Sequence, residues 1–253
     1  MNWRGFYTLF AKEVWRFMKV AVQTVLTPVV TAVLYLVVFA HVLEEHVQVY
    51  PGVTYTAFLI PGLIMMSVIQ NAFANSSSSL IQSKMNGNIV FVLLAPISSL
   101  EFYLAFVLAA IARGVMVGVV LYAVALGFAD LPVPHLGMLL AFGVLGSGLL
   151  GALGLIGGIW ADKYDQLAAF QNFLILPLSF LSGVFYSLYS LSPFWQTVSR
   201  FNPFFYMIDG VRYGFLGVSD VSPYQSLWII SLFFIAISVV AWFMIERGYK
   251  LRR

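Results

Sequence analysis

The sequence predicts an all-helical integral membrane protein that crosses the bilayer about six times. Hydrophobic residues make up 61% of the chain and charged residues only 9%, whereas soluble domains carry about 25% charged residues. Six apolar runs are also long enough to span a bilayer, which takes about 20 residues. We expect one transmembrane domain over residues 1–253, with spans at 20–41, 55–77, 102–128, 135–159, 167–186 and 224–245.

Residues 2–19, before the first span, predict an amphipathic helix. One helical face carries Trp3, Phe6, Phe10, Val14 and Phe17, and the opposite face carries Arg4, Thr8, Lys12, Arg16 and Lys19. We expect an interfacial helix whose aromatic face enters the acyl region while Lys12, Arg16 and Lys19 meet anionic lipid headgroups. The alternatives are a cytoplasmic extension of the first span or a helix docked on another protein.

The distribution of charge around the spans predicts their orientation. Most lysines and arginines lie in the N-terminal segment, the loops after the second and fourth spans, and the tail. The acidic segment Glu44, Glu45 and His46 lies between the first two spans, on the opposite side. Because basic loops stay in the cytoplasm, both termini are predicted to be cytoplasmic.

The loop after the second span is unusually apolar and predicts a short surface helix over residues 82–96. It contains Gly87, the apolar run from Ile89 to Ala95, and Pro96, which ends a helix. Apolar residues without a core to join usually contact a membrane surface or a partner. Either use suits a contact helix for a cytoplasmic protein.

Arg113 in the third span and the glycines of the fourth are the notable features inside the spans. A charge at the bilayer centre is costly, so Arg113 either faces the bundle interior, a wet cavity or a carboxylate, or snorkels to the headgroups if the span starts later. Gly143, Ser147 and Gly151 are spaced by four, as are Gly154 and Gly158. This spacing favours close helix packing over a hinge or sliding surface.

The segment between the fifth and sixth spans is aromatic and is broken by Pro193 and Pro203. Its pieces are too short to cross a bilayer of about 30 Å. We therefore predict that residues 188–216 form a re-entrant segment on the outer side. Its aromatic side chains either line an exit gate or form the belt that is common at membrane interfaces, and composition favours the belt.

No catalytic, metal or cofactor motif is found in the sequence. It lacks the phosphate-binding G-x-x-x-x-G-K-[ST] loop, H-E-x-x-H and G-x-S-x-G, and it has no cysteine. The three histidines lie near predicted span ends and are expected at the interface rather than on a metal. We expect this chain not to be an enzyme and not to bind nucleic acid.

Several short motifs, taken together, resemble the type-2 ABC exporter permeases. They are Leu181–Tyr186, Leu191–Trp195, Asn202–Tyr206 and Asp209–Arg212, together with Leu93–Ser98 and Glu101 in the loop after the second span. The resemblance covers nearly the whole chain. It implies a homodimer in a bacterial inner membrane that carries two separate ATP-binding-cassette subunits, where ATP and Mg bind. It also implies outward transport of an amphipathic lipid, lipid-linked glycan or drug.

The same resemblance assigns roles to particular residues. A cytoplasmic coupling helix that contacts the ATPase would include Asn86, Gly87, Val90, Leu93, Leu94 and Pro96, with further contacts near Lys12 to Lys19. The re-entrant helices that close the outer end would be held by Ser182, Gly183, Pro193, Asn202, Pro203, Asp209 and Arg212. The loop is poor in acidic residues before Leu93, which departs from many relatives.

Two other functions compete with the exporter. A secondary transporter or channel is expected to show an inverted repeat or carboxylates inside its spans, and neither is found in the sequence. A membrane-embedded enzyme acting on lipids needs paired carboxylates or a nucleophile beside a base. The sequence does not identify the cargo, because aromatic side chains stack on sugars as well as on acyl chains.

Overall fold

The structure, a computed structural model, describes residues 2–40 and 49–251. The described part is 79% helix and has no strands, as predicted. Five of its helices are long and apolar enough to cross a membrane. They are α2 (Ala21–Tyr35, continued by the π-helix η1, Leu36–Ala40), α4 (Tyr55–Met85), α6 (Ser99–Ala125), α7 (Leu136–Trp160) and α12 (Pro223–Glu246).

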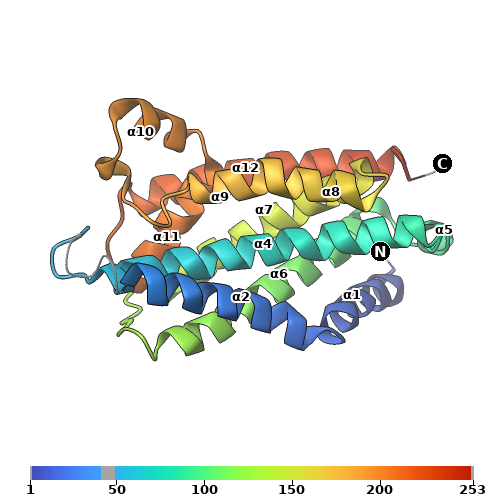
Figure 1. The fold of residues 1–253 in the computed structure, drawn as a ribbon. Helices are drawn as coiled ribbons and strands as arrows, with labels where there is room; N and C mark the ends of the chain where they lie inside the picture. The colour runs from blue at the N-terminus through green and yellow to red at the C-terminus, as the bar shows by residue number, and fades with distance from the viewer. Residues whose placement is uncertain (1, 41–48, 252–253) are drawn as a thin grey trace.

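The predicted fifth span, 167–186, is replaced by a segmented helix. It consists of α8 (Tyr164–Phe170), the π-helix η2 (Gln171–Ile175) and α9 (Leu176–Phe180). None of these pieces reaches the length of a span by itself, and turns follow from Leu181. Figure 1 shows α8 and α9 in line along the bundle. The predicted loop residues Glu44, Glu45 and His46 lie outside the described residues.

The bundle has two distinct ends (Figure 1). At one, the α5 end, lie α1 (Trp3–Met18), α5 (Ile89–Leu94) and the C-terminal end of α12. At the other, the α10 end, lie η3 (Leu188–Ser190) and α10 (Pro193–Arg200), and α11 (Pro203–Leu216) returns from there into the bundle. Proline stands in the first turn of both α10 and α11, where a missing N–H costs nothing. Both described chain ends lie at the α5 end (Figure 1), and a cytoplasmic location for that end stays a prediction.

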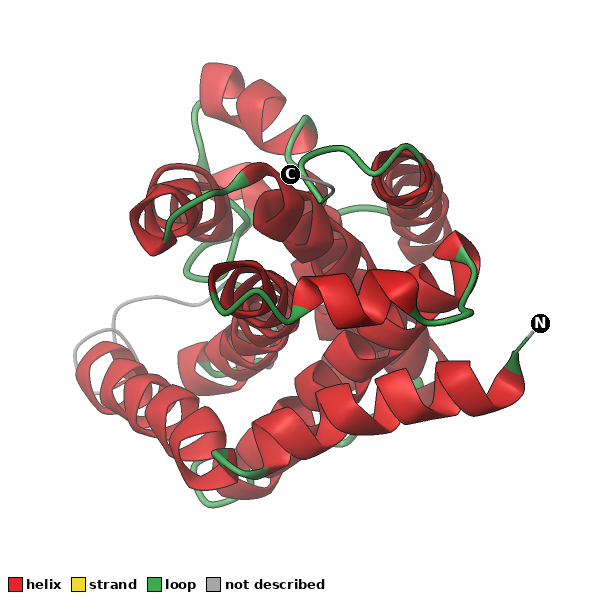
Figure 2. Cartoon of the chain, turned by 90° about the vertical axis from the view of Figure 1, so that its right-hand side faces the viewer, coloured by secondary structure: helices red, strands yellow, loops and turns green. Residues whose placement is uncertain are grey.

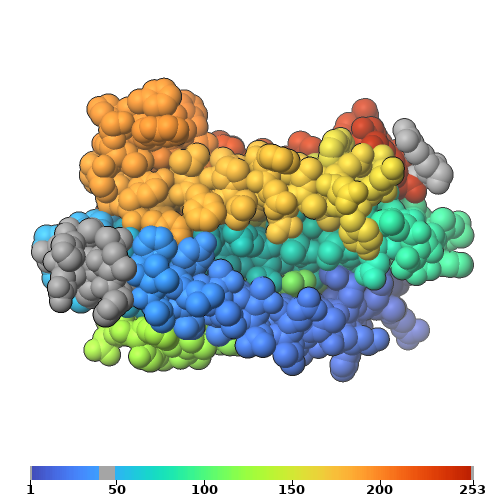
Figure 3. Space-filling model, viewed as in Figure 1, coloured from blue at the N-terminus to red at the C-terminus, as the bar shows by residue number. Residues whose placement is uncertain are grey.

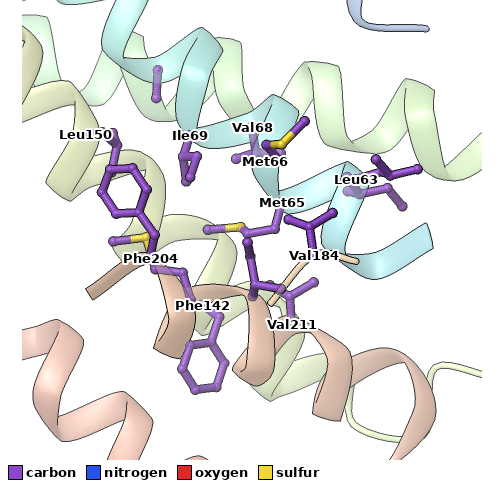
Figure 4. Close-up of a cluster of buried hydrophobic side chains, with 14 of the residues drawn as sticks. Leu63, Met65, Met66, Val68, Ile69, Phe142, Leu150, Val184, Phe204 and Val211 are labelled. Carbon is purple, nitrogen blue, oxygen red and sulfur yellow. The ribbon is translucent and has the colours of Figure 1, made fainter. Parts of the chain in front are cut away.

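Helix α4 is the centre of the fold and the most buried of the five long helices. It packs against α6, α7 and α11. Figure 4 shows this core, with Met65 and Ile69 from α4 near Phe142 of α7 and Phe204 of α11. The helix runs past its predicted end at residue 77, because most of its serines are small enough to be buried and at least one bonds to its own helix. Ser77, for example, donates its hydroxyl hydrogen bond to the carbonyl of Phe73 at 2.8 Å.

The glycine stripe of α7 lies against α4 and α6, which agrees with the packing interpretation. A Cβ at Gly154 would be 2.4 Å from the carbonyl oxygen of Phe73, and one at Gly158 would be 2.9 Å from Cβ of Leu80. A Cβ at Gly151 would be 2.7 Å from Cβ of Ala110. Gly143 differs, because nothing lies within 4 Å of the Cβ position there. Close helix approach therefore extends from Ser147 to Gly158, since a Cβ at Gly114 of α6 would also be 2.7 Å from the Ser147 hydroxyl oxygen.

Helix α1 lies across the bundle at the α5 end (Figure 2) and packs on α6. Its predicted division into an aromatic lipid face and a basic headgroup face is wrong for two residues. Phe17 is buried within the chain. Arg16 points inward to α4 rather than to headgroups, because the fully buried Glu13 carboxylate accepts its Nε hydrogen bond at 3.2 Å. Trp3, Tyr7 and Trp15 are the aromatic side chains that α1 leaves exposed.

Candidate functional site

A polar cavity of about 410 Å³, open on one side, lies beside α4 between α2 and η2. Its lining comes from α1, α2, α4, α6 and η2, and Figure 3 shows the surface of α4 between α2 and the α8–α9 segment. The polar lining residues are Arg16, Gln23, Thr24, Thr27, Thr31, Ser67, Gln70, Asn71, Ser78, Arg113 and Gln171. Two lining residues carry positive charge and none is a carboxylate. We call this space the arginine cavity.

Arg113 forms the α6 wall of the arginine cavity, near the middle of that helix. Its guanidinium donates to the amide oxygen of Asn71 on α4, at 3.3 Å from Nε and 3.0 Å from Nη2. The amide of Asn71 in turn donates to the carbonyl of Ser67 at 3.1 Å, which fixes its orientation. Of the environments predicted for Arg113, the structure shows the cavity. Its partner is a neutral amide rather than a carboxylate.

Arg16 closes the arginine cavity toward the α5 end. Its Nη2 donates to the backbone and side-chain oxygens of Asn75, at 2.7 and 2.9 Å, and Nη1 donates to Ser78 at 3.3 Å. Glu13 accepts from both Arg16 and Lys12, the latter at 3.0 Å. One carboxylate thus faces two cations, so the region keeps a positive charge.

A second polar cluster joins the loops at the α10 end. Asp209 on α11 accepts from the backbone N–H groups of Asp220 and Val221, at 2.7 and 3.1 Å. Arg212, one turn later, lies 3.9 Å from Asp209 and donates to the carbonyl of Gly183 at 2.7 Å. All of these charged side chains are buried. The predicted residues Gly183, Asp209 and Arg212 are therefore brought together.

Asp220 is the residue of this cluster that sequence reasoning missed. Its carboxylate accepts from the hydroxyls of Tyr50 and Ser187, the latter at 2.6 Å, and from the N–H of Leu188 at 2.6 Å. It ties three loops that lie far apart in the sequence. No local motif marks such a residue, because its partners come from segments that only the fold brings close.

The other predicted residues of this end shape the backbone. Asn202 caps α11 by accepting from the N–H of Phe204 at 3.0 Å, and its amide donates to the carbonyl of Leu178 at 2.7 Å. Gly183 has a φ of +77°, a conformation that glycine adopts without strain. Ser182 donates to the carbonyl of Ser179. These residues hold the chain path between α9 and α11.

The predicted contact segment 82–96 contains the end of α4, a turn at residues 86–88, and α5. One side of α5 is fixed to the bundle through the buried Ile89 and the partly buried Leu93. The other side is uncovered, with Phe91 exposed by 74% and Leu94 by 77%. Asn2 donates to the carbonyl of Pro96 at 3.0 Å and so fastens α1 to this loop.

Charged residues missed by sequence reasoning fasten the elements next to α5. Lys84, at the end of α4, donates to the carbonyls of Ile159 and Ala161 at the end of α7, at 2.8 and 2.6 Å. Lys250 donates to the Asp162 carboxylate at 2.8 Å. This hydrogen bond is the main reason that the pKa of Asp162 is lowered from its ordinary value. The C-terminal tail is thereby held to the α7–α8 turn.

Comparison with known proteins adds the family. The family model described as "ABC-2 type transporter" matches residues 4–216. This chain belongs to the ABC-2 type transporter family. It is 38% identical over 252 residues to the inner membrane transport permease YadH of Escherichia coli K12, a match that covers all of this chain and 98% of that protein. It is also 30% identical over 203 residues to nodulation protein J of Rhizobium leguminosarum bv. trifolii, covering 75% and 74% of the two chains.

As an ABC-2 permease, the chain is a membrane subunit of an ABC transporter, a family whose members associate with ATP-binding-cassette subunits. Such permease subunits are generally not catalytic. The described residues hold no group of three or more side chains that suits a metal ion.

Proposed function

We propose that this chain is the permease of an ATP-driven exporter in a bacterial inner membrane. Two copies assemble with two separate ATP-binding-cassette subunits, which bind ATP and Mg. Alternating access moves an amphipathic substrate, a lipid, lipid-linked glycan or drug, from the cytoplasmic to the outer side. The α5 end is cytoplasmic, and the α8–η2–α9 segment is the sixth crossing.

The uncovered side of α5 is the observation that carries this proposal. Exposed aromatic and aliphatic side chains at the end of a bundle, outside the region suited to lipid, are costly unless a partner covers them. Phe91 and Leu94 are such side chains, and the opposite side of α5 is anchored through Ile89. A helix anchored on one side and uncovered on the other suits the coupling helix that seats in a cassette subunit.

Two further features support the exporter. The α4 helix runs without a break from the arginine cavity to within three residues of Ile89, so that movement of α5 acts directly on the cavity wall. The α2 and α12 helices are mostly unburied within the chain, which leaves surface for lipid and for a second copy. The printed name of the Escherichia coli relative, an inner membrane transport permease, supports the location.

The test separates coupling from folding. Phe91→Glu and Leu94→Glu are made in the permease, and each variant is purified with its cassette subunit. We expect the permease to stay folded, and substrate-stimulated ATP hydrolysis and transport to fall at least about tenfold, because a buried unpaired charge costs more than 1.4 kcal/mol. Leu93→Glu is not suitable, because Leu93 is partly buried in the core.

Leu100→Glu is the matched control, since Leu100 is 51% exposed on the first turn of α6 and lies outside α5. It should keep assembly and transport. Normal ATP-driven transport by both α5 variants would show that α5 is not the coupling contact. Transport that persists without ATP and follows an ion gradient would support a secondary transporter instead.

A further inference from the structure

The arginine cavity has an imbalance of charge within the bundle. Arg16 has a carboxylate partner in Glu13, but the partners that the structure gives Arg113 end at the neutral oxygen of Asn71. No lining residue of the cavity is acidic. A guanidinium inside a span stays charged and is costly to hold without an anion. Arg113, on the α6 wall of the cavity, therefore lacks an anionic partner among the described residues.

The cavity also has more hydrogen-bond donors than acceptors. The side-chain oxygens of Asn71 and Asn75 already accept from the two arginines. Two bonds use only part of the donor capacity of Arg113, which has five N–H groups. The side-chain nitrogen of Gln70, a lining residue, is buried and has no hydrogen-bond partner. Unused donors and positive charge at one place favour an anion that accepts several hydrogen bonds.

Apolar surface lies immediately beside these donors. On α2, an adjoining and mostly apolar hollow shares Val20, Gln23 and Thr27 with the arginine cavity and is also lined by Leu26, which is 55% exposed. A molecule that places an anionic group in the cavity can therefore lay a hydrocarbon chain along α2 within the membrane.

We propose that the arginine cavity binds the anionic group, a phosphate or carboxylate, of an amphipathic molecule, with Arg113 as the charged contact and Gln70 as a further donor. The binding itself needs neither ATP nor a cassette subunit. Its assignment to the transported substrate rests on the exporter proposed above. The cavity then selects cargo by headgroup charge, while the chain or glycan attached to it is less constrained.

Binding is measured on the purified full-length chain in a nonionic detergent without ATP. The probes are dioctanoyl phosphatidate, laurate, dioctanoylglycerol and inorganic phosphate. We expect saturable binding of phosphatidate or laurate and none of the neutral diacylglycerol, with inorganic phosphate competing only weakly. Equal binding of the neutral lipid would overturn the proposal. Inorganic phosphate binding as tightly as phosphatidate would refute the amphipathic part of it.

Variants locate the site. Arg113→Gln keeps a donor toward Asn71 and should lower the affinity for the anionic probe at least about tenfold, because charged hydrogen bonds are the strong ones. Arg113→Lys, which keeps the charge but loses the planar fork, should recover part of that loss. Arg200→Gln, at an exposed arginine of the α10 end, is the matched control and should bind normally. Wild-type binding by a folded Arg113→Gln would overturn the assignment.

The two proposals fail separately. If α5 variants transport normally but Arg113→Gln loses anion binding, the coupling assignment is wrong and the cavity assignment stands. If the anionic probes bind the wild type and Arg113→Gln alike, the cavity assignment is wrong, whatever the source of energy for transport.

Discussion

Replacing Gly154 by alanine tests whether the α4–α7 contact is as close as the structure has it. The added Cβ would lie 2.4 Å from the carbonyl oxygen of Phe73 and 3.2 Å from its carbonyl carbon and Cα. All three are backbone atoms of a long helix, so no side chain can turn aside to make room. The two helices have to move apart, and the rest of their interface moves with them.

The expected cost is about 1 to 3 kcal/mol, the range for overpacking a filled core. Better helix propensity offsets up to about 1 kcal/mol of it, since alanine favours a helix over glycine by that amount. Gly143→Ala in the same helix is the matched control, because nothing lies within 4 Å of its added Cβ. In Gly143→Ala only the gain in helix propensity remains. Gly154→Ala should therefore be less stable than wild type, and Gly143→Ala should be as stable or more stable.

The assay is unfolding of the purified protein in mixed micelles, followed by tryptophan fluorescence as denaturing detergent is added. We expect a lower midpoint for Gly154→Ala and an unchanged or higher one for Gly143→Ala. Equal midpoints for the two variants would show that α7 does not contact α4 at Gly154. If both variants had a lower midpoint than wild type, α7 as a whole would be intolerant of substitution, and the contact at Gly154 would not be the cause.

Three further results are expected. Asp220→Ala should lower stability by at least about 2 kcal/mol, since it leaves three donors unpaired, two of them buried, and limited proteolysis should then cut the 181–190 loop faster. Lys84→Met should lower the stability by about 1 kcal/mol in the same unfolding assay, because the carbonyls at the end of α7 lose their charged donor. Lys163→Met, at an exposed lysine, is the control and should lower the stability less. Because the folded pKa of Asp162 is lowered, its contact with Lys250 is present above the ordinary carboxyl pKa of about 4 and is lost as pH falls through the lower folded value. The protection of residues 248–251 from hydrogen exchange, relative to the intrinsic rate at each pH, should therefore fall in acid and, for Asp162→Asn, already at neutral pH.

The apolar length of the chain was enough to predict most of its long helices. The predicted runs 102–128, 135–159 and 224–245 correspond to α6, α7 and α12 within three residues at each end. The fifth run was placed less well, because Pro177 and two changes of helix type divide it. Hydropathy measures how apolar a run is, but it does not show where the helix geometry changes.

The end of α4 shows a second limit of sequence reasoning. The predicted span ended at residue 77, within a run of serines, yet Ser76, Ser77 and Ser79 are buried. Small hydroxyl side chains can bond to their own helix, so polarity in the sequence does not mean exposure. The same limit explains Arg16, where helical periodicity showed that the bases share one face but not that Glu13 and Asn75 draw one of them inward.

The candidate site was predicted in parts. The sequence marked Arg113 as an unusual charge and grouped Gly183, Asp209 and Arg212 by resemblance to a family. Asn71, Gln70 and Asp220 carried no such signal, because their roles depend on neighbours from other helices and loops. A long-range partner becomes visible only when the helices are packed.

If the transport cycle is driven from the α5 end, as proposed above, the position of α4 predicts one mechanical step. This helix supplies Asn71 to Arg113 and Asn75 to Arg16, and both asparagines lie on the same rigid rod as Lys84. Because the backbone of Gly154 lies against Phe73, between the two asparagines, α4 cannot slide along α7 without losing that contact. A tilt about this point keeps the helices together while it separates or closes the two arginine walls. We expect α4 to pivot at the close contact between Gly154 and Phe73. The tilt would then expose or hide the charged side chains of the arginine cavity.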